Sequence, residues 1–368
     1  MRVLLCGGGT AGHVIPAIAM GEMIQKHFRN SVIAFAGRSG GDENRAYLKT
    51  GHRLYTVDIL GISHSLSINN AKSFIKVLKS SRKATEVLKE FKPDLIIGTG
   101  GYVCYPFIRQ GQRLGIPTMI HESNAYPGLV TRLLGKRCDC VMLNISETQN
   151  YLKRKDNVTV VGIPTLTEFN SVSKIEARRK LGIKAGELLI VSFGGSLGSG
   201  ALNETIPELI MRYTSKLPNV RHVHSTGRAN YDDIKKRFPS LFSADNRVKI
   251  VPYIENMPLL LTAADLAITR SGAITLAELS RSATPSILIP SPNVTANHQY
   301  KNAQYAKTLG MAEILEENEL TPETVNSLIS DFIKCPTKLE AMSRAAAYAY
   351  PNNAETSIIQ LIGKLGLS

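Results

Sequence analysis

Two glycine-rich segments each follow an apolar run and precede a helix-like stretch. Residues 7–12 are Gly-Gly-Gly-Thr-Ala-Gly, and residues 194–200 are Gly-Gly-Ser-Leu-Gly-Ser-Gly. Glycine allows a sharp turn and a close backbone approach to an anion, and the helix that follows presents unbonded N–H groups. Each segment therefore predicts a phosphate-binding loop. The second is not a P-loop, because no Gly-Lys-Ser/Thr follows, yet four glycines in seven residues exceed what one turn needs.

An imidazole and a carboxylate could move a proton near such loops. His13 lies at the start of the first helix-like stretch, where an imidazole can act as a general base. Residues 121–124, His-Glu-Ser-Asn, directly follow an apolar run, and polar groups at the carboxyl end of a buried strand point to the ligand site of an α/β fold. The plainer interpretations are a helix-capping His13 and ordinary turn chemistry at 121–124.

Two segments of the second half carry groups that suit a ribose or a sugar. Residues 270–278, Arg-Ser-Gly-Ala-Ile-Thr-Leu-Ala-Glu, pass from a strand into a helix, and Glu278 could accept hydrogen bonds from a diol. Its alternative is a surface ion pair with Arg281, worth roughly a few tenths of a kcal/mol. Residues 298–303, His-Gln-Tyr-Lys-Asn-Ala, offer neutral polar groups for sugar hydroxyls, or simply begin a helix that Asn297 caps.

The composition excludes several classes of protein. The net charge of +14 would attract polyanions, but there is no zinc finger, no aromatic RNA-binding signature and no block of five like charges, so nucleic acid is not expected as a partner. No apolar run approaches the ~18 residues of a membrane span, which favours a cytoplasmic protein. Five scattered cysteines without zinc-finger spacing predict reduced, partly buried thiols, and without an Asp-x-Asp clamp we expect no metal.

Short apolar runs alternate with helix-like stretches along the whole chain. Because these runs lack in/out alternation, they suit strands buried on both faces of a parallel sheet. The pattern restarts after residues 162–164, followed by a stretch at 165–173 that is typical of a linker, and the chain is expected to be helical beyond about residue 320. The expected strands are Val3–Cys6, Val32–Ala36, Leu54–Ile59, Leu95–Ile97, Thr118–Ile120, Cys140–Leu143, Val158–Val161, Leu188–Phe193, Val220–His224, Val248–Val251, Leu266–Thr269 and Ser286–Ile289. The expected helices are Pro16–Phe28, Asn70–Phe91, Tyr105–Leu114, Ala201–Tyr213, Asn256–Ala263, Ala273–Arg281 and Asn297–Leu309.

These patterns predict an α/β protein with two doubly wound, Rossmann-like domains that face each other across a cleft. At 368 residues the chain is too long for one ordinary core, and such folds bind ligands at the carboxyl ends of their strands. A nicotinamide dehydrogenase is disfavoured, because the acidic residue expected after the second strand is replaced by Gly37-Arg38-Ser39.

Taken in order and at this spacing, five segments closely resemble the MurG family of bacterial glycosyltransferases. They are GGTAGHVIPA, HESNAYPGL, FGGSLGSGALN, RSGAITLAE and HQYKNA, and the resemblance extends from residue 7 to about residue 305. It implies the GT-B fold, with an acceptor- and membrane-facing domain at 1–163, a UDP-GlcNAc-binding domain at 164–344, and a C-terminal helix at about 345–368 that packs back on the first domain. It also implies transfer of N-acetylglucosamine (GlcNAc) from UDP to lipid I, the undecaprenyl-pyrophosphoryl-N-acetylmuramyl (MurNAc) pentapeptide, giving lipid II without a cofactor.

The resemblance implies roles for individual residues. It makes His13 the first and Glu122 the second candidate for the proton acceptor, and it places Gly8, Gly9 and Thr10 at the acceptor diphosphate. On the donor, Ser196 would contact the diphosphate, the Ile254 backbone the uracil, and Glu278 the ribose. The full set of implied donor-binding residues is Thr10, Gly12, Asn124, Ser196, Ile254, Ala273, Ile274, Thr275, Glu278, His298 and Gln299.

Several positions depart from the family pattern. Ala11 replaces a frequent glycine, and His298 stands where some relatives have Gln. After its first domain the family often has Gly-Asn-Pro-x-Arg, whereas here Ile163 and Leu166 occupy the positions of the Asn and the Arg. Because that Arg would lie near the donor phosphates, we expect a nearby cation such as Arg270 to take its place.

The implied chemistry is a single inverting displacement beside a membrane. His13 would take the acceptor proton, and the amides of the second loop would stabilise the departing UDP. The polyprenyl acceptor implies a peripheral protein at the cytoplasmic face of the inner membrane. Residues 72–83 mix apolar and basic residues at helical spacing, so they could form an interfacial helix on an anionic surface, or an ordinary amphipathic helix with Phe74, Val77 and Leu78 in the core.

Other activities fit parts of the same pattern. Related folds glycosylate diacylglycerol or natural products, and a UDP-GlcNAc 2-epimerase shares the architecture and the donor. A non-catalytic sugar-nucleotide binder would bind the donor and turn nothing over. These alternatives differ in whether UDP is released and in whether its release requires an acceptor.

Overall fold

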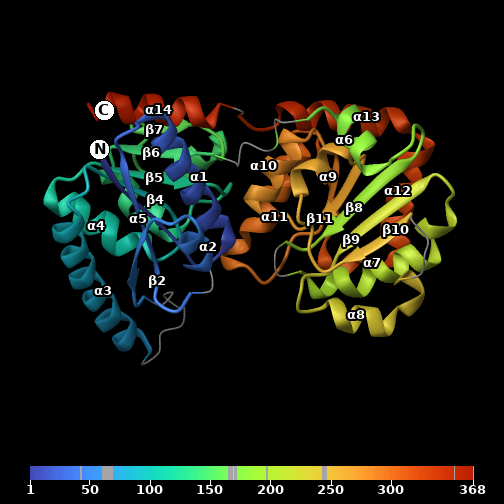
Figure 1. The fold of residues 1–368 in the computed structure, drawn as a ribbon, viewed down its shortest axis with the longest axis horizontal. Helices are drawn as coiled ribbons and strands as arrows, with labels where there is room; N and C mark the ends of the chain where they lie inside the picture. Colours follow the sequence, from blue (N-terminus) through green and yellow to red (C-terminus); the bar gives the residue numbers. More distant parts are fainter. Residues whose placement is uncertain are drawn as a thin grey trace. The chain divides into compact units, whose positions relative to one another are not determined.

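The structure is a computed structural model that describes residues 1–41, 44–59, 69–164, 169, 172–195, 198–242, 247–351 and 353–367, with the backbone alone at residues 11, 69–78 and 295. The chain forms two compact units (Figure 1). Unit 1 comprises Met1–Thr165 and Pro351–Ser368, and unit 2 comprises Leu166–Tyr350. The chain therefore returns to unit 1 between Tyr350 and Pro351.

Unit 1 is built on a seven-stranded sheet in which all neighbouring strands are parallel. The strand order is β3-β2-β1-β4-β5-β6-β7. The strands are β1 Arg2–Gly7, β2 Val32–Arg38, β3 Arg53–Val57, β4 Leu95–Gly100, β5 Thr118–Glu122, β6 Cys140–Leu143 and β7 Val158–Val160. The helices are α1 Ala11–His27, α2 Asn44–Lys49, α3 Asn69–Phe91, α4 Cys104–Leu114, α5 Leu129–Leu134 and α14 Ala354–Lys364.

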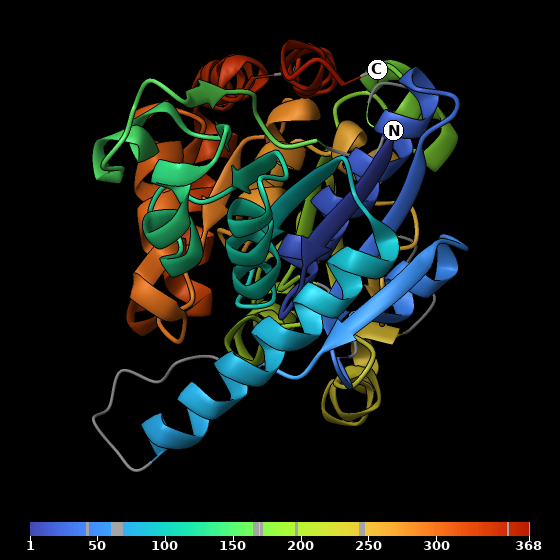
Figure 2. The ribbon, with the colours of Figure 1, turned by 90° about the vertical axis from the view of Figure 1, so that its left-hand side faces the viewer.

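Helices cover both faces of the unit 1 sheet, because its central strands are apolar on both sides. On β1, Leu4 and Cys6 pack into a core layer with residues of α3, α4 and α5. Val3 and Leu5 point to the other face, into a layer shared with α1 and α14. The C-terminal helix is thus part of the core of unit 1. Figure 2 shows the N-terminal end of α3 extending beyond this sheet.

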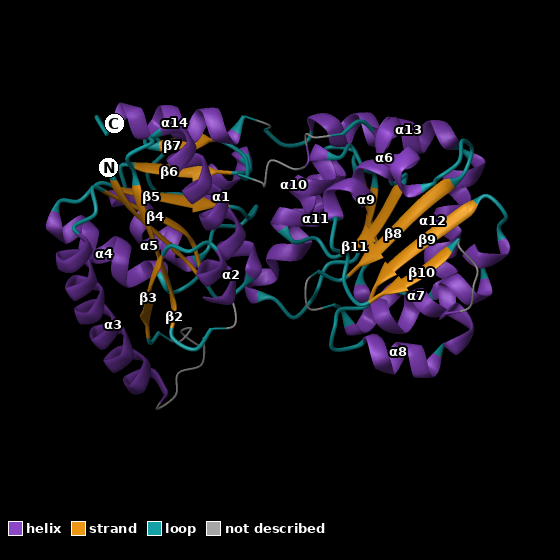
Figure 3. Cartoon of the chain, viewed as in Figure 1, coloured by secondary structure: helices purple, strands orange, loops and turns teal. Residues whose placement is uncertain are grey.

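Unit 2 repeats the architecture with a six-stranded parallel sheet in the order β10-β9-β8-β11-β12-β13. Figure 3 shows β8, β9, β10 and β11 of this sheet with helices around them. The strands are β8 Leu188–Phe193, β9 Val220–Ser225, β10 Val248–Val251, β11 Leu266–Thr269, β12 Ser286–Leu288 and β13 Ala312–Ile314. The helices are α6 Lys174–Leu181, α7 Gly200–Arg212, α8 Tyr231–Arg237, α9 Met257–Ala263, α10 Ala273–Arg281, α11 His298–Thr308, α12 Pro322–Lys334 and α13 Pro336–Tyr348.

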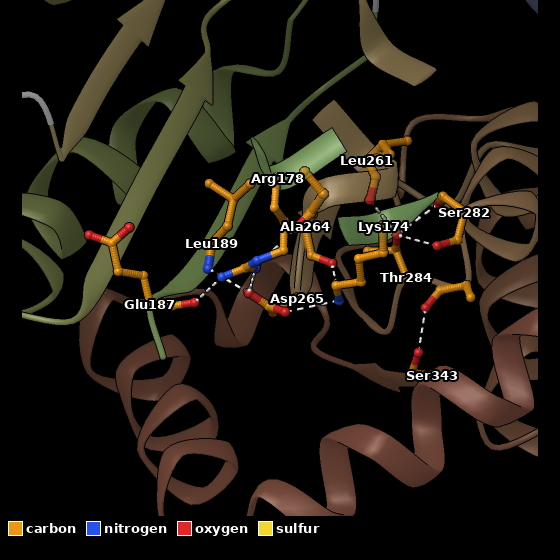
Figure 4. A network of polar contacts seen from close by, with 12 residues as sticks. Lys174, Arg178, Glu187, Leu189, Leu261, Ala264, Asp265, Ser282, Thr284 and Ser343 are labelled. Carbon is orange, nitrogen blue, oxygen red and sulfur yellow. Dashed lines mark hydrogen bonds and ion pairs between the residues drawn. The ribbon is translucent and has the colours of Figure 1, made fainter. Parts of the chain in front are cut away.

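A polar network fastens the start of unit 2 to the amino ends of its central strands (Figure 4). Arg178 of α6 donates to the Asp265 carboxylate over 2.7 Å, and Lys174 bonds the same carboxylate over 2.9 Å. Asp265 also accepts from the amide of Leu189, at the start of β8. This network lies at the edge of the sheet opposite the glycine-rich loop that follows β8, so it anchors α6 without entering the candidate site.

The structure confirms the expected parallel sheets and corrects several element boundaries. Helix α1 begins at Ala11 and contains Pro16, although we expected it to begin at that proline. Proline lacks an N–H, but so near the start of a helix only the bond to residue 12 is lost. Strand β13 was not predicted, because its three residues include Glu313 and show no apolar run. The supposed linker at 165–173 lies mostly outside the described residues.

The cysteines are the reduced and mostly buried thiols that we expected. Cys6, Cys104, Cys138 and Cys140 are buried free thiols, and Cys335 is exposed. Within the described ranges, no helix has both the length and the apolar character needed to cross a bilayer.

Candidate functional site

Each sheet has a point at which the strand order reverses, and most of the predicted motifs lie there. In unit 1 the reversal falls between β1 and β4, so the loops after these strands diverge toward opposite faces of the sheet. In unit 2 it falls between β8 and β11, beside Gly194 and Gly195 after β8 and residues 270–272 after β11. Doubly wound folds bind ligands at such points. Each unit therefore has a candidate site of its own.

The loops after β1 and β4 of unit 1 pack backbone against backbone. The amide of Gly8 donates to the carbonyl of Gly100 over 3.3 Å. Gly101 has φ +81°, and a Cβ there would lie 2.1 Å from the carbonyl oxygen of Gly8. Only glycine fits this contact, because both the conformation and the space exclude a side chain.

His13 is fixed by this pair of loops. Its Nδ1 lies 2.9 Å from the carbonyl oxygen of Gly8 and 3.3 Å from Oγ1 of Thr10. A carbonyl only accepts, so Nδ1 carries the proton in the neutral ring and the lone pair is on Nε2. The ring packs against Gly100, where a Cβ would lie 2.3 Å from Cδ2 of His13. The backbone of His13 is also held, since Thr99 donates to its carbonyl over 2.7 Å.

The start of α1 presents a helix end without a side-chain cap. Thr10 is the N-cap residue, but its hydroxyl makes no capping hydrogen bond. Gly9 and Thr10 are exposed, Gly12 is partly buried, and Gly8 is buried against the β4 loop. Backbone N–H groups at an uncapped helix start favour an anion, through both hydrogen bonding and the helix dipole.

Glu122 is engaged on both oxygens of its carboxylate. Oε1 accepts from the backbone amide of Asn124 over 3.1 Å and from its side chain over 3.3 Å. Oε2 accepts from the amide of Gly128 and the hydroxyl of Thr131, both over 2.8 Å. The side chain is 6% exposed. The carboxylate thus holds Asn124 and the start of α5 in place. It is poorly suited to accept a proton, because all four neighbouring groups are donors.

The neighbours of Glu122 are also structural in their contacts. His121 is buried, with Nε2 2.8 Å from the carbonyl oxygen of Gly162 and Nδ1 3.3 Å from the Ser123 hydroxyl. Burial lowers the pKa of His121, so the ring is neutral. Asn124 is partly buried, and the hydroxyl of Thr148 donates to its carbonyl. Residues 121–124 therefore form a hydrogen-bonded network in which Glu122 holds both the backbone and the side chain of Asn124.

The second glycine-rich loop lies at the carboxyl end of β8, as expected. Gly194 packs on Ser199, where a Cβ would lie 2.4 Å from Cβ of that serine. Ser199 then caps α7 by accepting from the amide of Leu202. Ser196, the expected diphosphate contact, lies outside the described residues. Ile254 is buried just beyond β10, four residues after Ile250 in the chain.

Residues 270–278 pass from β11 into α10 as expected. Gly272 is the N-cap residue of α10 and supplies no side-chain cap, so the first turn at Ala273, Ile274 and Thr275 again offers backbone N–H groups. These three residues are partly buried. The helix start thus resembles that of α1 in being open to an anion.

Glu278 lies one turn further along α10. It is partly buried, and burial raises the pKa of its carboxyl to about 7. The surface ion pair with Arg281 that we considered is wrong, since no residue in the described part of the chain pairs with this carboxylate. A desolvated carboxylate without a partner is a candidate for ligand binding.

Arg270, which we expected to take the place of the family's arginine, is already engaged by other groups of unit 2. Its guanidinium forms an ion pair with Glu317 and donates to the carbonyl of Ile289 over 3.1 Å. The side chain is 13% exposed. Arg270 therefore ties the carboxyl ends of β11 and β12 together. The position of the family's arginine, Leu166, lies outside the described residues.

The start of α11 is joined to the β11 loop. The Ser271 hydroxyl donates to the carbonyl of Gln299 over 2.8 Å, and the Gln299 side-chain oxygen accepts from the amide of Ser291 over 2.9 Å. The amide protons on Nε2 of Gln299 are then its remaining hydrogen-bonding groups. Ala296 and Asn297 have φ of 55° and 50°, a left-handed pair that is unfavourable for non-glycine residues and common at ligand sites. His298 is partly buried beside them.

The loop after β4 and the residues that support the second glycine-rich loop were not predicted from the sequence. Gly98, Gly100 and Gly101 carry a signal that could have been found, because three glycines follow an apolar run just as residues 7–9 do. The buried polar residues Asn203 and His224 carried no such signal. Within the residues that the structure describes, no cluster of three or more His, Cys, Asp or Glu could hold a metal ion.

Known proteins resemble this chain over almost its full length. Residues 3–143 match the model of the glycosyltransferase family 28 N-terminal domain, and residues 189–362 match the C-terminal domain of the same family. A protein from Acetivibrio thermocellus is 38% identical over 98% of this chain and 97% of its own length. Its name is UDP-N-acetylglucosamine--N-acetylmuramyl-(pentapeptide) pyrophosphoryl-undecaprenol N-acetylglucosamine transferase. A protein of the same name from Carboxydothermus hydrogenoformans is 40% identical over 94% of this chain and 92% of its own.

Solved structures share the fold. The crystal structure of Acinetobacter baumannii MurG superposes with a TM-score of 0.79, at 27% identity and with 99% of each chain covered. A UDP-GlcNAc 2-epimerase from Neisseria meningitidis has a TM-score of 0.69 at 17% identity, with 99% of this chain and 100% of that chain covered. At that identity the second likeness concerns the fold alone.

Replacing Glu122 by glutamine tests the positioning role of its carboxylate. The amide of the new side chain would turn N–H groups toward donors, so E122Q should destabilise the protein by about 1–3 kcal/mol. The change is measured by thermal or urea denaturation followed by circular dichroism. The control is E22Q on the exposed surface of α1, which should change stability by less than about 0.5 kcal/mol. Equal stability of E122Q and E22Q would show that the four hydrogen bonds to Glu122 do not stabilise the folded protein.

Proposed function

This chain belongs to the MurG family of glycosyltransferases, and from that premise we propose that it transfers GlcNAc from UDP-GlcNAc to the 4-hydroxyl of MurNAc in lipid I. Both substrates carry a diphosphate. The observation that carries the proposal is that each unit places a glycine-rich loop and an uncapped helix start, that of α1 or α10, where its strand order reverses. Two diphosphate substrates require two such places.

Unit 2 is proposed to bind the donor. The amides of the loop at 194–198, with Ser196, and of the α10 start at Ala273–Thr275 would receive the UDP diphosphate. Glu278 would accept hydrogen bonds from the ribose hydroxyls, and the Ile254 backbone would contact uracil. His298 and the Nε2 amide of Gln299 would meet the GlcNAc hydroxyls, because the Gln299 oxygen is already bonded to Ser291.

Unit 1 is proposed to bind the acceptor and to supply the base. The diphosphate of lipid I would meet Gly8, Gly9 and Thr10 at the start of α1. Thr10, Gly12 and Asn124 would approach the donor sugar from this unit. His13 is the better proton acceptor, because its Nδ1 is held by Gly8 and its lone pair is on Nε2. Glu122 would act through Asn124, since its own oxygens are engaged by four donors.

The proposed reaction is one displacement with inversion. The MurNAc 4-oxygen forms a bond to the anomeric carbon of GlcNAc as the bond from that carbon to the UDP oxygen breaks, and the hydroxyl proton passes to Nε2 of His13. An α-linked donor thereby becomes a β-linked product. Charge grows on the departing UDP, where pre-aimed amides stabilise it without reorganisation. Arg270 is paired with Glu317, so the proposal assigns this role to the amides.

UDP release tests the transferase activity. We expect release from UDP-GlcNAc only when a lipid I analogue is present, together with a GlcNAc-MurNAc disaccharide product, and the same rate with EDTA. Coupled detection of UDP and mass spectrometry of the product measure both. Release without an acceptor would instead indicate an epimerase or hydrolase, and loss of activity in EDTA would refute the metal-free mechanism. A diacylglycerol acceptor serves as the control for acceptor identity.

The pKa of Glu278 predicts how donor affinity depends on pH. Ribose hydroxyls donate to the ionised carboxylate, so binding requires loss of the proton that burial retains up to about pH 7. The affinity for UDP-GlcNAc should therefore rise from pH 6 to pH 8, by up to about ten-fold. Calorimetry with UDP-GlcNAc is suitable because its diesterified diphosphate does not titrate in this range. The matched variant E278Q should bind more weakly and without this pH dependence; an unchanged pH dependence in E278Q would exclude Glu278 as its source.

We also propose that unit 1 binds an anionic membrane surface at the inner face of the cell membrane, where lipid I would be reached. Residues 1–165 and 351–368 contain 23 Lys and Arg against 12 Asp and Glu, so most of the net charge of +14 belongs to unit 1. Lys79, Arg82 and Lys83 are exposed on α3, whose N-terminal end extends beyond the sheet (Figure 2). The side chains at 69–78, including Lys72, Phe74 and Lys76, lie outside the described residues. Basic surface charge near anionic lipid contributes about 1 kcal/mol per residue.

Charge reversal on α3 tests the membrane contact. The triple variant K72E/K76E/K79E should lose most of its binding to vesicles that contain anionic lipid, while its activity on a short-chain soluble acceptor should be retained. Vesicle co-sedimentation measures the binding. The charge-matched control K184E/K216E/K249E changes exposed lysines of unit 2 and should bind nearly as the wild type does. Equal loss in both variants would mean that only the overall charge matters, and no loss in the first would remove α3 from the contact.

A further inference from the structure

A row of buried polar side chains lies between helix α7 and the strands β8 and β9 of unit 2. Its members are Thr214, His222, Ser192, His224 and Asn203, and each is at most 3% exposed. Ser192 and His224 are paired across the two parallel strands, and His222 lies two residues earlier on the same face of β9. Asn203 belongs to the first turn of α7, and Thr214 follows the last turn. The row therefore runs the length of α7.

The donor and the acceptor of each hydrogen bond in this row can be assigned, starting from the Thr226 carbonyl oxygen at its end. Nδ2 of Asn203 lies 2.9 Å from the carbonyl oxygen of Thr226, which can only accept, so Oδ1 of Asn203 must face the other way. Oδ1 lies 3.2 Å from Nε2 of His224, which therefore carries a proton. Burial holds the pKa of His224 at about 4, so the ring is neutral and its Nδ1 is an acceptor. Ser192 then donates to that Nδ1 over 2.9 Å, in preference to the carbonyl oxygen of Val223 at 3.5 Å.

The hydrogen bonds at the far end of the row, from Ser192 to Thr214, have the same direction. With its proton directed at His224, the Ser192 oxygen accepts from Nε2 of His222 over 2.9 Å. Burial holds the pKa of His222 at about 3, so its Nδ1 accepts in turn from the hydroxyl of Thr214 over 3.2 Å. All five donors thus point the same way, from Thr214 toward Thr226. Hydrogen bonds aligned in this manner polarise and strengthen one another.

The row ends on the glycine-rich loop that the donor diphosphate is proposed to meet. Gly198 has φ +82°, and a Cβ there would lie 2.1 Å from the carbonyl oxygen of Thr226. The position of that carbonyl therefore sets the position of Gly198. A second amide, Nδ2 of Asn230, lies 3.3 Å from the same oxygen. Two amide donors on this carbonyl offset its partial negative charge beside a loop that must receive an anion.

We propose that Asn203 and His224 are positioning residues for the donor: through the Thr226 carbonyl they hold Gly198 in the position in which unit 2 receives the diphosphate. This inference rests on the proposed binding of UDP-GlcNAc by unit 2. Neither side chain touches the ligand. Asn203 sets the carbonyl directly, and His224 fixes the orientation of the Asn203 amide.

The test separates the diphosphate from the nucleoside. In N203L the carbonyl loses its shorter hydrogen bond, so the Kd for UDP should rise about ten-fold, as expected for one buried hydrogen bond. The Kd for uridine should change by less than about two-fold, because uridine has no diphosphate to meet the loop. Calorimetry measures UDP, and ligand-observed NMR measures uridine. General destabilisation would not discriminate between these two ligands.

A matched control comes from the other end of the same row. T214V removes the hydrogen bond to His222, is equally buried, and lies at the end remote from the loop. It should lower thermal stability while leaving the UDP affinity unchanged. If N203L does not fold, N230A in the partly buried loop before α8 removes the second donor to the Thr226 carbonyl and should raise the Kd for UDP by a smaller factor, again without effect on uridine.

The alternative outcomes are distinct. Unchanged UDP affinity in folded N203L and N230A, or equal losses for UDP and uridine, would overturn the positioning role while leaving the donor site in place. Failure of the wild-type chain to bind UDP would overturn the proposed donor site, and the positioning role with it.

Discussion

Backbone packed directly on backbone at the carboxyl edge of each sheet is the constraint on which the candidate site of each unit depends. In unit 1 the β4 loop presses Gly101 against the carbonyl of Gly8, and in unit 2 Gly198 presses against the carbonyl of Thr226. A side chain at either glycine would force the loops apart. The glycines therefore do more than allow turns: they let two neighbouring loops share one surface of peptide groups, and that surface is what an anion would meet.

These glycine-rich loops have few side chains of their own, so neighbouring residues must hold their backbone in place. In unit 1 the support comes from Thr99 and from the imidazole of His13, which bonds the Gly8 carbonyl while packing on Gly100. In unit 2 it comes from Asn203 and the two neutral histidines behind it. Both supports direct N–H donors at carbonyl oxygens, which reduces the negative potential that those oxygens would otherwise present to a phosphate.

The sequence predicted the architecture and the motif positions because both depend on local patterns. Apolar runs without alternation gave parallel strands, and glycines after those runs marked the carboxyl edge. It failed where the cause lies in tertiary contacts. In the part of the chain that the structure describes, strand β13 pairs with β12 alone, so three residues around Glu313 suffice at an edge. The commitment of Arg270 to Glu317 joins residues far apart in the chain, and no spacing rule signals it. His224 and Asn203 appeared as unremarkable polar residues within apolar elements.

Two glutamates show why residue type alone could not assign roles within the candidate site. Glu122 and Glu278 both lie near carboxyl ends of strands, in segments that resemble family motifs. Glu122 accepts hydrogen bonds from four donors, so its lone pairs are occupied. Its carboxylate holds Asn124 and caps α5. Glu278 has no such partners among the described residues and is desolvated, which raises its pKa to about 7 and leaves its hydrogen-bonding capacity for a ligand. A buried polar group that the protein satisfies is structural, whereas one that it leaves unsatisfied stores free energy that a ligand can release. By that criterion the carboxylate that the donor should meet is Glu278.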